Sequence, residues 1–300
     1  MKLIRQLANA KEQINAVDTT GFLREISAQE LRLLQNTLLE MLLDVLAVCQ
    51  AHNIRAFLLG GTALGAVRHK GFIPWDDDID IGMPRDDYKR FIPAFETYLS
   101  DRYVLNAPNY SETALARFPK ILKKDSYLDT GGIRDKSLCK VFLDIFIVDR
   151  IPENTFKRKW KGLWCNVLEF IAGQVAYYEC LDEIWIRQFK TNGKTSYYIR
   201  RFIGWLFSFQ CASRWYDSID RVIQYPKETR LWGLPTGCRH YFGEIFPEDV
   251  FFPNGTGVFD GHAVPMVNDP DAYLKNLYGD FMQIPPPEKR QKHFVRELRL

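Results

Sequence analysis

The sequence predicts an α+β fold in which a mixed β-sheet core is flanked by helices and carries an added helical region. Short apolar strand patterns alternate with amphipathic helix patterns between residues 26 and 155. Residues 156–235 instead follow a helical period and are rich in aromatic side chains. With 300 residues, 46% of them apolar, the chain is long enough to bury a sizeable core.

This organisation divides the chain into four expected segments. They are an N-terminal helical segment (1–52), a core with the chemistry-bearing motifs (53–155), a helical aromatic and basic insert (156–235), and a loop-rich segment that packs on the core (236–300).

Composition excludes several classes of protein. A formal net charge of +3 carries no global signature of a nucleic-acid partner. The six cysteines are scattered, without CxxC pairs or zinc-ligand spacing, as in a cytosolic protein with reduced thiols. The N-terminus lacks the continuous apolar core of a signal peptide, and no apolar run reaches the ~20 residues of a membrane span. We therefore expect a cytoplasmic protein, and peripheral contact with the inner face of the membrane stays open.

The stretch from Ile26 to His52 predicts the first helix. Ser27 is a suitable N-cap, and Glu30 three residues later completes a capping box. Leucines then recur at spacings of three and four residues, which is typical of a helix packed on the core.

A strand, a glycine turn and a helix are expected next. Residues 55–59 read as a buried strand that ends at Gly60-Gly61, and Thr62 is placed to cap a short helix to Arg68. Free N–H groups at such a helix start suit a phosphate group. A Gly-Gly pair alone is weak evidence, because many turns use one.

Four aspartates follow within five positions. The alternation of Asp78, Ile79, Asp80 and Ile81 has the period of a strand, which would place Asp78 and Asp80 on one face, about 7 Å apart. Burying unpaired carboxylates costs several kcal/mol each. Because the aspartates enter an apolar element, a divalent metal site is favoured over the alternative of a solvated acidic loop.

The rest of the core segment reads as one helix and further strands. A helix is expected over 86–99, bent at Pro93. The strand fragments are expected at 103–105, 116–122 and 127–129. Within the second fragment, Lys120 is a candidate phosphate ligand, and a solvated lysine is the alternative.

Residues 140–149, KVFLDIFIVD, predict a strongly apolar strand interrupted by Asp144. Burying an isolated aspartate in a central strand costs free energy. The run itself offers no cationic partner, so Asp144 is expected to be a third carboxylate of the site that contains Asp78 and Asp80. A buried salt bridge to a distant arginine is the alternative.

The helical insert combines aromatic and basic residues. Residues 156–230 contain 13 Lys or Arg against 7 Asp or Glu. The stretch Tyr197–Trp215 is expected to be a core helix with snorkelling arginines, or else a face for a membrane or polymer. The aromatic residues noted here are Trp160, Trp164, Tyr177, Tyr178, Trp185, Tyr197, Tyr198, Trp205 and Trp215.

The C-terminal segment is rich in turns. Residues 271–278 predict a short helix within it. His293 is a lone histidine, which is more often structural than a metal ligand or proton shuttle.

Taken together, Gly60-Gly61, Asp78 with Asp80, and Asp144 in FLDIFIVD resemble the signature of the LicD family within the nucleotidyltransferase superfamily, which includes fukutin and fukutin-related protein. The tail LYGDFMQIPPPEKRQKHF is similar to the C-terminal end of this family. The resemblance runs from about Leu31 to Phe294. Members of the family differ most in the region 156–230, for which the resemblance implies no residue roles.

The resemblance implies a nucleotidyltransferase-like core and a phosphotransferase that moves phosphocholine, or a related phospho-alcohol, from CDP-choline or another CDP-alcohol to a glycan hydroxyl. The acceptor would be a teichoic acid, lipopolysaccharide or capsule, and would be lipid-linked in some cases. Oxygen ligands favour Mg²⁺ or Mn²⁺ over zinc. Transfer of a nucleotide to an acceptor and a non-catalytic binding module are the alternatives.

In that reading, Asp78, Asp80 and Asp144 are the catalytic and metal-binding residues. The phosphate-binding residues are Gly60, Gly61, Thr62, Arg68 and Lys120. A choline group would need aromatic faces, for which Trp75 and the aromatics of the insert are candidates.

Overall fold

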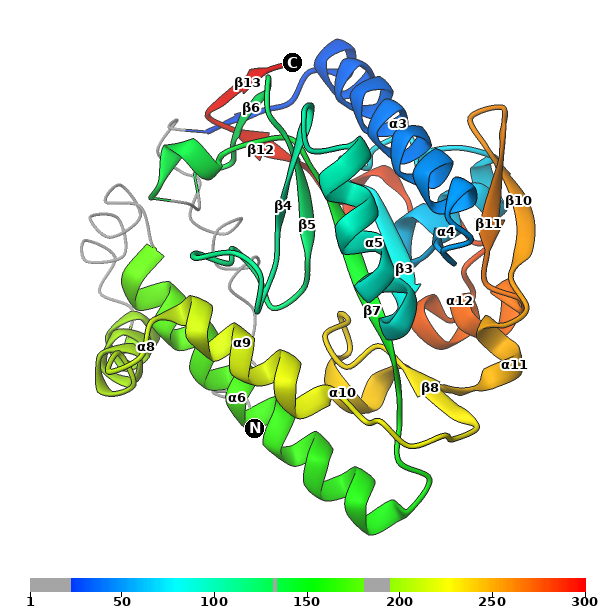
Figure 1. Cartoon of the computed structure of the whole chain (residues 1–300). Coiled ribbons are helices and arrows are strands. Elements are labelled where there is room, and N and C mark those ends of the chain that lie inside the picture. Colours follow the sequence, from blue (N-terminus) through cyan, green and yellow to red (C-terminus); the bar gives the residue numbers. More distant parts are fainter. Residues whose placement is uncertain (1–22, 132–133, 181–194) are drawn as a thin grey trace.

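A computed structural model describes residues 23–131, 134–180 and 195–300 (Figure 1). Most of the expected 1–52 segment is therefore described, whereas residues 1–22 and Trp185 lie outside the described residues.

The described helices are α3 (Ala28–Ala51), α4 (Gly60–His69), α5 (Arg85–Tyr98), η1 (Lys136–Leu138), α6 (Thr155–Cys180), α8 (Thr195–Leu206), α9 (Ala212–Ile223), α10 (His240–Gly243), α11 (Glu248–Phe251), α12 (Pro270–Tyr278) and η2 (Pro287–Lys289). The strands are β1 (Arg24–Glu25), β2 (Phe57–Leu58), β3 (Asp80–Pro84), β4 (Tyr103–Asn106), β5 (Lys120–Lys123), β6 (Tyr127–Asp129), β7 (Phe142–Arg150), β8 (Leu231–Gly233), β9 (Ile245–Pro247), β10 (Gly255–Phe259), β11 (His262–Met266), β12 (Phe294–Val295) and β13 (Glu297–Arg299).

The first helix forms as its capping pattern predicts. The amide of Glu30 donates to Ser27 Oγ at 3.2 Å, and the amide of Ser27 donates to Glu30 Oε2 at 3.1 Å. These reciprocal bonds satisfy two amides that the start of a helix leaves without partners. Further along α3, Leu34, Leu38 and Leu42 are buried in the main core.

The central sheet is mixed, which confirms the predicted α+β class. Its strands run in the order β10, β11, β2, β3, β7, β5, β4, and the pair β8–β9 joins at β7. Strands β3 and β7 are parallel, whereas β2–β3, β5–β7 and β4–β5 are antiparallel. Helices α3 and α5 pack on β7, and α5 also packs on β3 (Figure 1).

Two details of the core differ from expectation. Strand β3 begins at Asp80, so the expected strand at Asp78 is wrong in its first residues. At Asp80 both backbone groups are hydrogen-bonded. Its carbonyl oxygen accepts from the Leu59 amide at 3.0 Å, and its amide donates to Thr62 Oγ1 at 2.8 Å. The segment expected to be loop-rich also contributes the hairpin β10–β11, and β11 pairs with β2 at the sheet edge.

The helical insert forms a separate layer beneath the sheet (Figure 1). Helix α6 packs on both α8 and α9. Gly204 permits the close approach of α8, because a Cβ atom there would lie 2.4 Å from the carbonyl oxygen of Gln174 on α6. Within residues 23–131, 134–180 and 195–300, no helix combines the length and apolar character that crossing a membrane requires.

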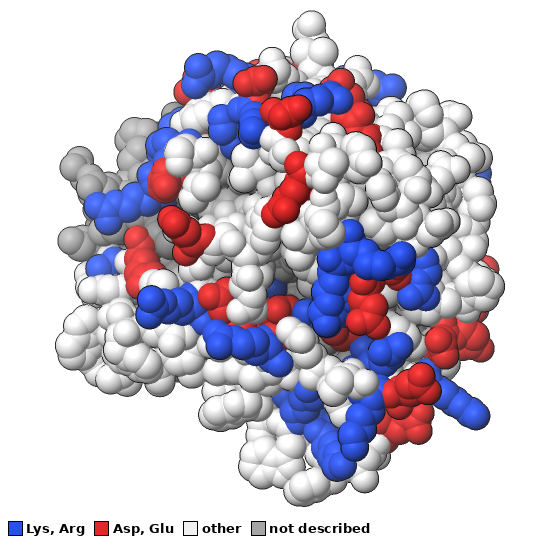
Figure 2. All heavy atoms as spheres, in the orientation of Figure 1, with Lys and Arg blue, Asp and Glu red and all other residues white. Residues whose placement is uncertain are grey.

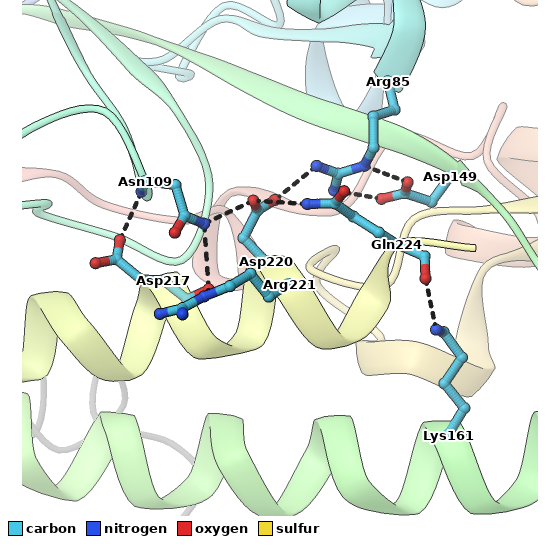
Figure 3. Close-up of polar contacts among 8 residues, drawn as sticks. All are labelled: Arg85, Asn109, Asp149, Lys161, Asp217, Asp220, Arg221 and Gln224. Carbon is cyan, nitrogen blue, oxygen red and sulfur yellow. Dashed lines mark hydrogen bonds and ion pairs between the residues drawn. The ribbon is translucent and has the colours of Figure 1, made fainter. Parts of the chain in front are cut away.

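Charges of both signs are interspersed over much of the face seen in Figure 2. A buried network connects the sheet to the helical layer (Figure 3). Arg85, which follows β3, donates from Nε to Asp149 Oδ1 at 2.5 Å and from Nη2 to Oδ2 at 2.8 Å. Its Nη1 donates to Asp220 Oδ1 on α9 at 2.8 Å, and Asn109 donates to the other oxygen of Asp220 at 2.9 Å. One guanidinium group thus compensates two buried carboxylates.

Replacing Arg85 with methionine should lower the free energy of unfolding by about 3–5 kcal/mol, because two buried carboxylates lose their cation. Urea denaturation measures this loss. The control is Arg102→Met, which removes an exposed arginine that pairs with Glu40 and Asp44 and should cost less than about 1 kcal/mol. Equal losses in the two variants would contradict the role given to the buried network.

Candidate active site

The Gly60-Gly61 turn lies against two carboxylates. Gly60 has a φ of +52°, and a Cβ atom there would lie 2.5 Å from Asp80 Oδ2. A Cβ atom on Gly61 would lie 2.8 Å from Asp76 Oδ2. The double glycine is therefore required for space at both positions, and at Gly60 also for its left-handed backbone. It brings the backbone at the start of α4 directly against the acidic residues.

Thr62 and Tyr273 fix the two sides of this turn. Helix α4 begins at Gly60 with Leu59 as N-cap, so the expectation that Thr62 caps the helix is wrong. Thr62 lies inside α4, where its hydroxyl accepts the Asp80 amide. The Gly60 amide, which the sequence suggested for phosphate, donates to the hydroxyl of Tyr273 on α12 at 3.1 Å.

Tyr273 was missed at the level of sequence. Its helix was predicted, and one face of that helix had to point at the core. The pattern carries no signal that relates this face to a turn more than two hundred residues earlier.

The acidic residues strongly perturb one another. Burial raises the pKa of Asp80 well above its ordinary value, and the charges of Asp78, Asp144 and Asp76 raise it further. Burial also raises the pKa of Asp76 to about 8, with Asp78 and Asp77 adding to the shift. Clustered carboxylates with raised pKa values are typical of sites that bind a cation or transfer a proton.

Asp144 lies beside Asp80 and has a cationic partner. The two residues are register partners on the parallel strands β3 and β7. Lys120 on β5 is the partner of Asp144 on its other side, and Lys120 Nζ lies 2.5 Å from Asp144 Oδ1. The same ammonium group lies 3.7 Å from the centre of the Phe142 ring. The alternative of a buried ion pair with a distant cation is therefore realised at Asp144, with Lys120, the lysine that was expected to bind phosphate, in place of an arginine.

Arg68 bonds to the C-terminal segment. Its Nη1 donates to the carbonyl oxygens of Phe281 at 2.7 Å and Gln283 at 3.4 Å, and its Nε donates to His69 Nε2 at 2.9 Å. The structure thus shows Arg68 fixing the loop after α12. Its role toward a phosphate stays a prediction.

His293 reaches the acidic turn from the C-terminal end of the chain. Its Nδ1 lies 2.7 Å from Asp77 Oδ1. Burial lowers the pKa of His293, but the hydrogen bond and charge of Asp77, with Asp76 and Asp78, outweigh burial and raise it. Nearby, the Arg290 guanidinium lies 4.4 Å from the centre of the Trp75 ring, so a cation already covers an aromatic face considered for choline.

A hard divalent cation fits this donor set. Asp78, Asp80 and Asp144 offer carboxylate oxygens, the ligands that Mg²⁺ and Mn²⁺ prefer, and burial, followed by the charges of Asp78 and Asp144, raises the pKa of Asp80. Among the described residues, three potential ligand atoms lie within 4.8 Å of one another at Asp76, Asp77 and His293. The three predicted ligands Asp78, Asp80 and Asp144 do not form such a group, and Lys120 pairs with Asp144.

Comparison with known proteins gives a consistent set of relatives. Residues 53–164 match the family model LicD/FKTN/FKRP, nucleotidyltransferase domain. The chain is 29% identical over 260 residues to the lipopolysaccharide cholinephosphotransferase LicD of Haemophilus influenzae, across 84% of this chain and 91% of that protein. It is 46% identical over 43 residues to the human ribitol 5-phosphate transferase FKRP, across 14% of this chain and 9% of FKRP.

The raised pKa of Asp76 predicts a pH-dependent stability. Since its pKa in the folded protein is about 8 and its ordinary value is 3.8, the folded state binds more protons, and this contribution to stability is lost as the pH rises from about 4 to 8. Asp76→Asn should therefore gain stability relative to the parent protein, by up to about 5 kcal/mol at pH 8 and little at pH 4.

Urea denaturation in EDTA at several pH values measures this difference. The control is Asp86→Asn, which changes a carboxylate that is 66% exposed and should alter stability little at each pH. A parent protein that gains stability over Asp76→Asn as the pH rises would contradict the assignment.

Proposed function

We propose that the chain is a LicD-like transferase that moves phosphocholine, or a related phospho-alcohol, from a CDP-activated donor to a sugar hydroxyl of a cell-surface glycan. Transfer of a phospho-alcohol to a glycan agrees with the names of LicD and FKRP. The observation that carries the proposal is the Gly60-Gly61 turn, against which the Asp80 carboxylate lies, with Asp144 in register on the adjacent strand.

Three carboxylates would hold the metal ion. Asp78, Asp80 and Asp144 would bind Mg²⁺ or Mn²⁺, which supplies charge neutralisation at the donor phosphates. Gly60, Gly61 and Thr62 would lie beside the donor phosphates. Because the Asp80 and Asp76 carboxylates lie against the two glycines, a phosphate group would meet this turn together with the metal ion.

In the proposed reaction, the acceptor hydroxyl attacks the phosphorus that carries the alcohol. A sugar O–P bond forms, the bond to the CMP oxygen breaks, and the hydroxyl proton passes to the Asp144 carboxylate. Lys120 orients Asp144 through their ion pair and adds positive charge beside the phosphates. We further propose a cytoplasmic enzyme, because five described cysteines are free thiols.

A donor screen tests the reaction class. The protein is incubated with Mg²⁺, a lipopolysaccharide or teichoic acid acceptor, and in turn CDP-choline, CDP-ribitol, CDP-glycerol or CDP-ethanolamine. We expect CMP release with at least one donor, abolished by EDTA and restored by Mg²⁺ or Mn²⁺. Release of pyrophosphate from CTP, with no CMP from any of these donors, would show nucleotide transfer instead.

Isosteric variants test the carboxylates. Asp78→Asn, Asp80→Asn and Asp144→Asn should each lower CMP release at least about 100-fold, because each removes a charge that acts at the phosphates. Circular dichroism and urea denaturation check that the variants fold, and Asp86→Asn serves as the control. Full turnover in any of the three would remove that residue from the catalytic set.

A further inference from the structure

The helical insert exposes an unusual number of large apolar side chains. Of the twenty such residues that are exposed in the described chain, ten lie on α6, on α8 and in the turn after α8. On α6 they are Phe156, Trp160, Leu163, Trp164 and Phe170. On α8 and its following turn they are Tyr198, Phe202, Trp205, Leu206 and Phe209. These ten residues are called the aromatic face below.

Each set forms one stripe along its helix. The spacings of four, three and one residues repeat in both sets and are those of a single helix face. Exposure is high, since Trp160 is 58% exposed, Trp205 58% and Phe209 77%. Monomeric soluble proteins rarely expose large apolar patches, and such patches typically mark interaction sites.

The opposite sides of the same helices already provide the core packing. Cys165, Leu168 and Ala172 of α6 are buried, as are Tyr197 and Arg200 of α8. The structure therefore contains both alternatives for Tyr197–Trp215 at once, a core side and an exposed side. The aromatic face is not needed for packing within the described chain.

Positive charge surrounds the start of this face. The first two turns of α6 contain Lys157, Arg158, Lys159 and Lys161, and no acidic residue occurs between positions 155 and 168. Cations at a helix N-terminus are unfavourable for the helix, because they oppose its dipole. Lys157 and Lys159 are exposed. Figure 2 shows Lys and Arg atoms beside uncharged atoms at the lower end of the molecule, where α6 begins.

We propose that the aromatic face docks on an anionic membrane surface. Tryptophan and phenylalanine side chains would enter the boundary between headgroups and acyl chains, while the α6 lysines meet lipid phosphates. Each basic residue near such a surface adds to the attraction. A second copy of the chain suits the face less well, because docking the same basic end against itself brings like charges together.

Helix α6 also connects this face to the candidate active site. Glu169, adjacent to Phe170, lies 3.3 Å from Arg117 and 2.7 Å from His240 Nδ1. Arg117 lies three residues before Lys120, which pairs with Asp144. A docked molecule would thus hold its carboxylates at a fixed orientation to the membrane, which suits an acceptor anchored there.

Vesicle flotation of the full chain tests the proposal without any turnover assay. The vesicles are pure phosphatidylcholine or equal parts of phosphatidylcholine and phosphatidylglycerol. The protein should float with the anionic vesicles at low salt and be released at high salt, because screening weakens the lysine contacts. Equal binding to both vesicles, or binding to neither, would overturn the proposal.

Two double variants separate the apolar and charged parts. Trp160→Ser with Trp205→Ser, and Lys157→Glu with Lys159→Glu, should each lower the fraction bound to anionic vesicles at least about tenfold. The matched control, Leu33→Ser with Tyr98→Ser, changes exposed apolar residues elsewhere and should bind as the parent does. Binding unchanged in the tryptophan variant would overturn the proposal.

Light scattering and CMP release complete the test. A parent dimer that the tryptophan variant converts to a monomer, with no vesicle binding, would assign the face to a second copy. CMP release with a water-soluble acceptor should stay unchanged in the variant that combines Lys157→Glu and Lys159→Glu. Membrane docking and the proposed chemistry therefore fail or succeed separately.

Discussion

Carboxylates that lie close together at one turn repel one another. The residues around the Gly60-Gly61 turn accommodate this repulsion. The glycines leave room for the Asp76 and Asp80 oxygens. Thr62 holds the Asp80 amide, and Lys120 compensates Asp144. Burial and the neighbouring carboxylates together raise the pKa values of Asp76 and Asp80. In the proposed function, a divalent cation would relieve this repulsion.

Local patterns were predictable from sequence, because their partners lie within a few residues. The capping box of Ser27 and Glu30 formed as expected. So did the apolar strand around Asp144 and the turn at Gly60. Each depends on a helix start, a strand period or a glycine conformation, which a short window of sequence specifies.

Long-range partners were not predictable in the same way. Lys120 meets Asp144 because β5 and β7 pair in one register, and a shift of one residue would turn the lysine to the other side of the sheet. Tyr273 reaches Gly60, and His293 reaches Asp77, only once the C-terminal segment has packed on the core. Each contact depends on a register or a packing that no single stretch of sequence contains.

The central sheet and the helical layer differ in their physical character. The acidic site needs fixed geometry, and it is assembled from strands β3, β5 and β7, which hydrogen bonds hold in register. The helical layer instead exposes adaptable aromatic and basic side chains, and Arg85 with Asp149 and Asp220 connects it rigidly to the sheet. The helical layer can therefore vary in its exposed side chains without disturbing the carboxylates of the sheet.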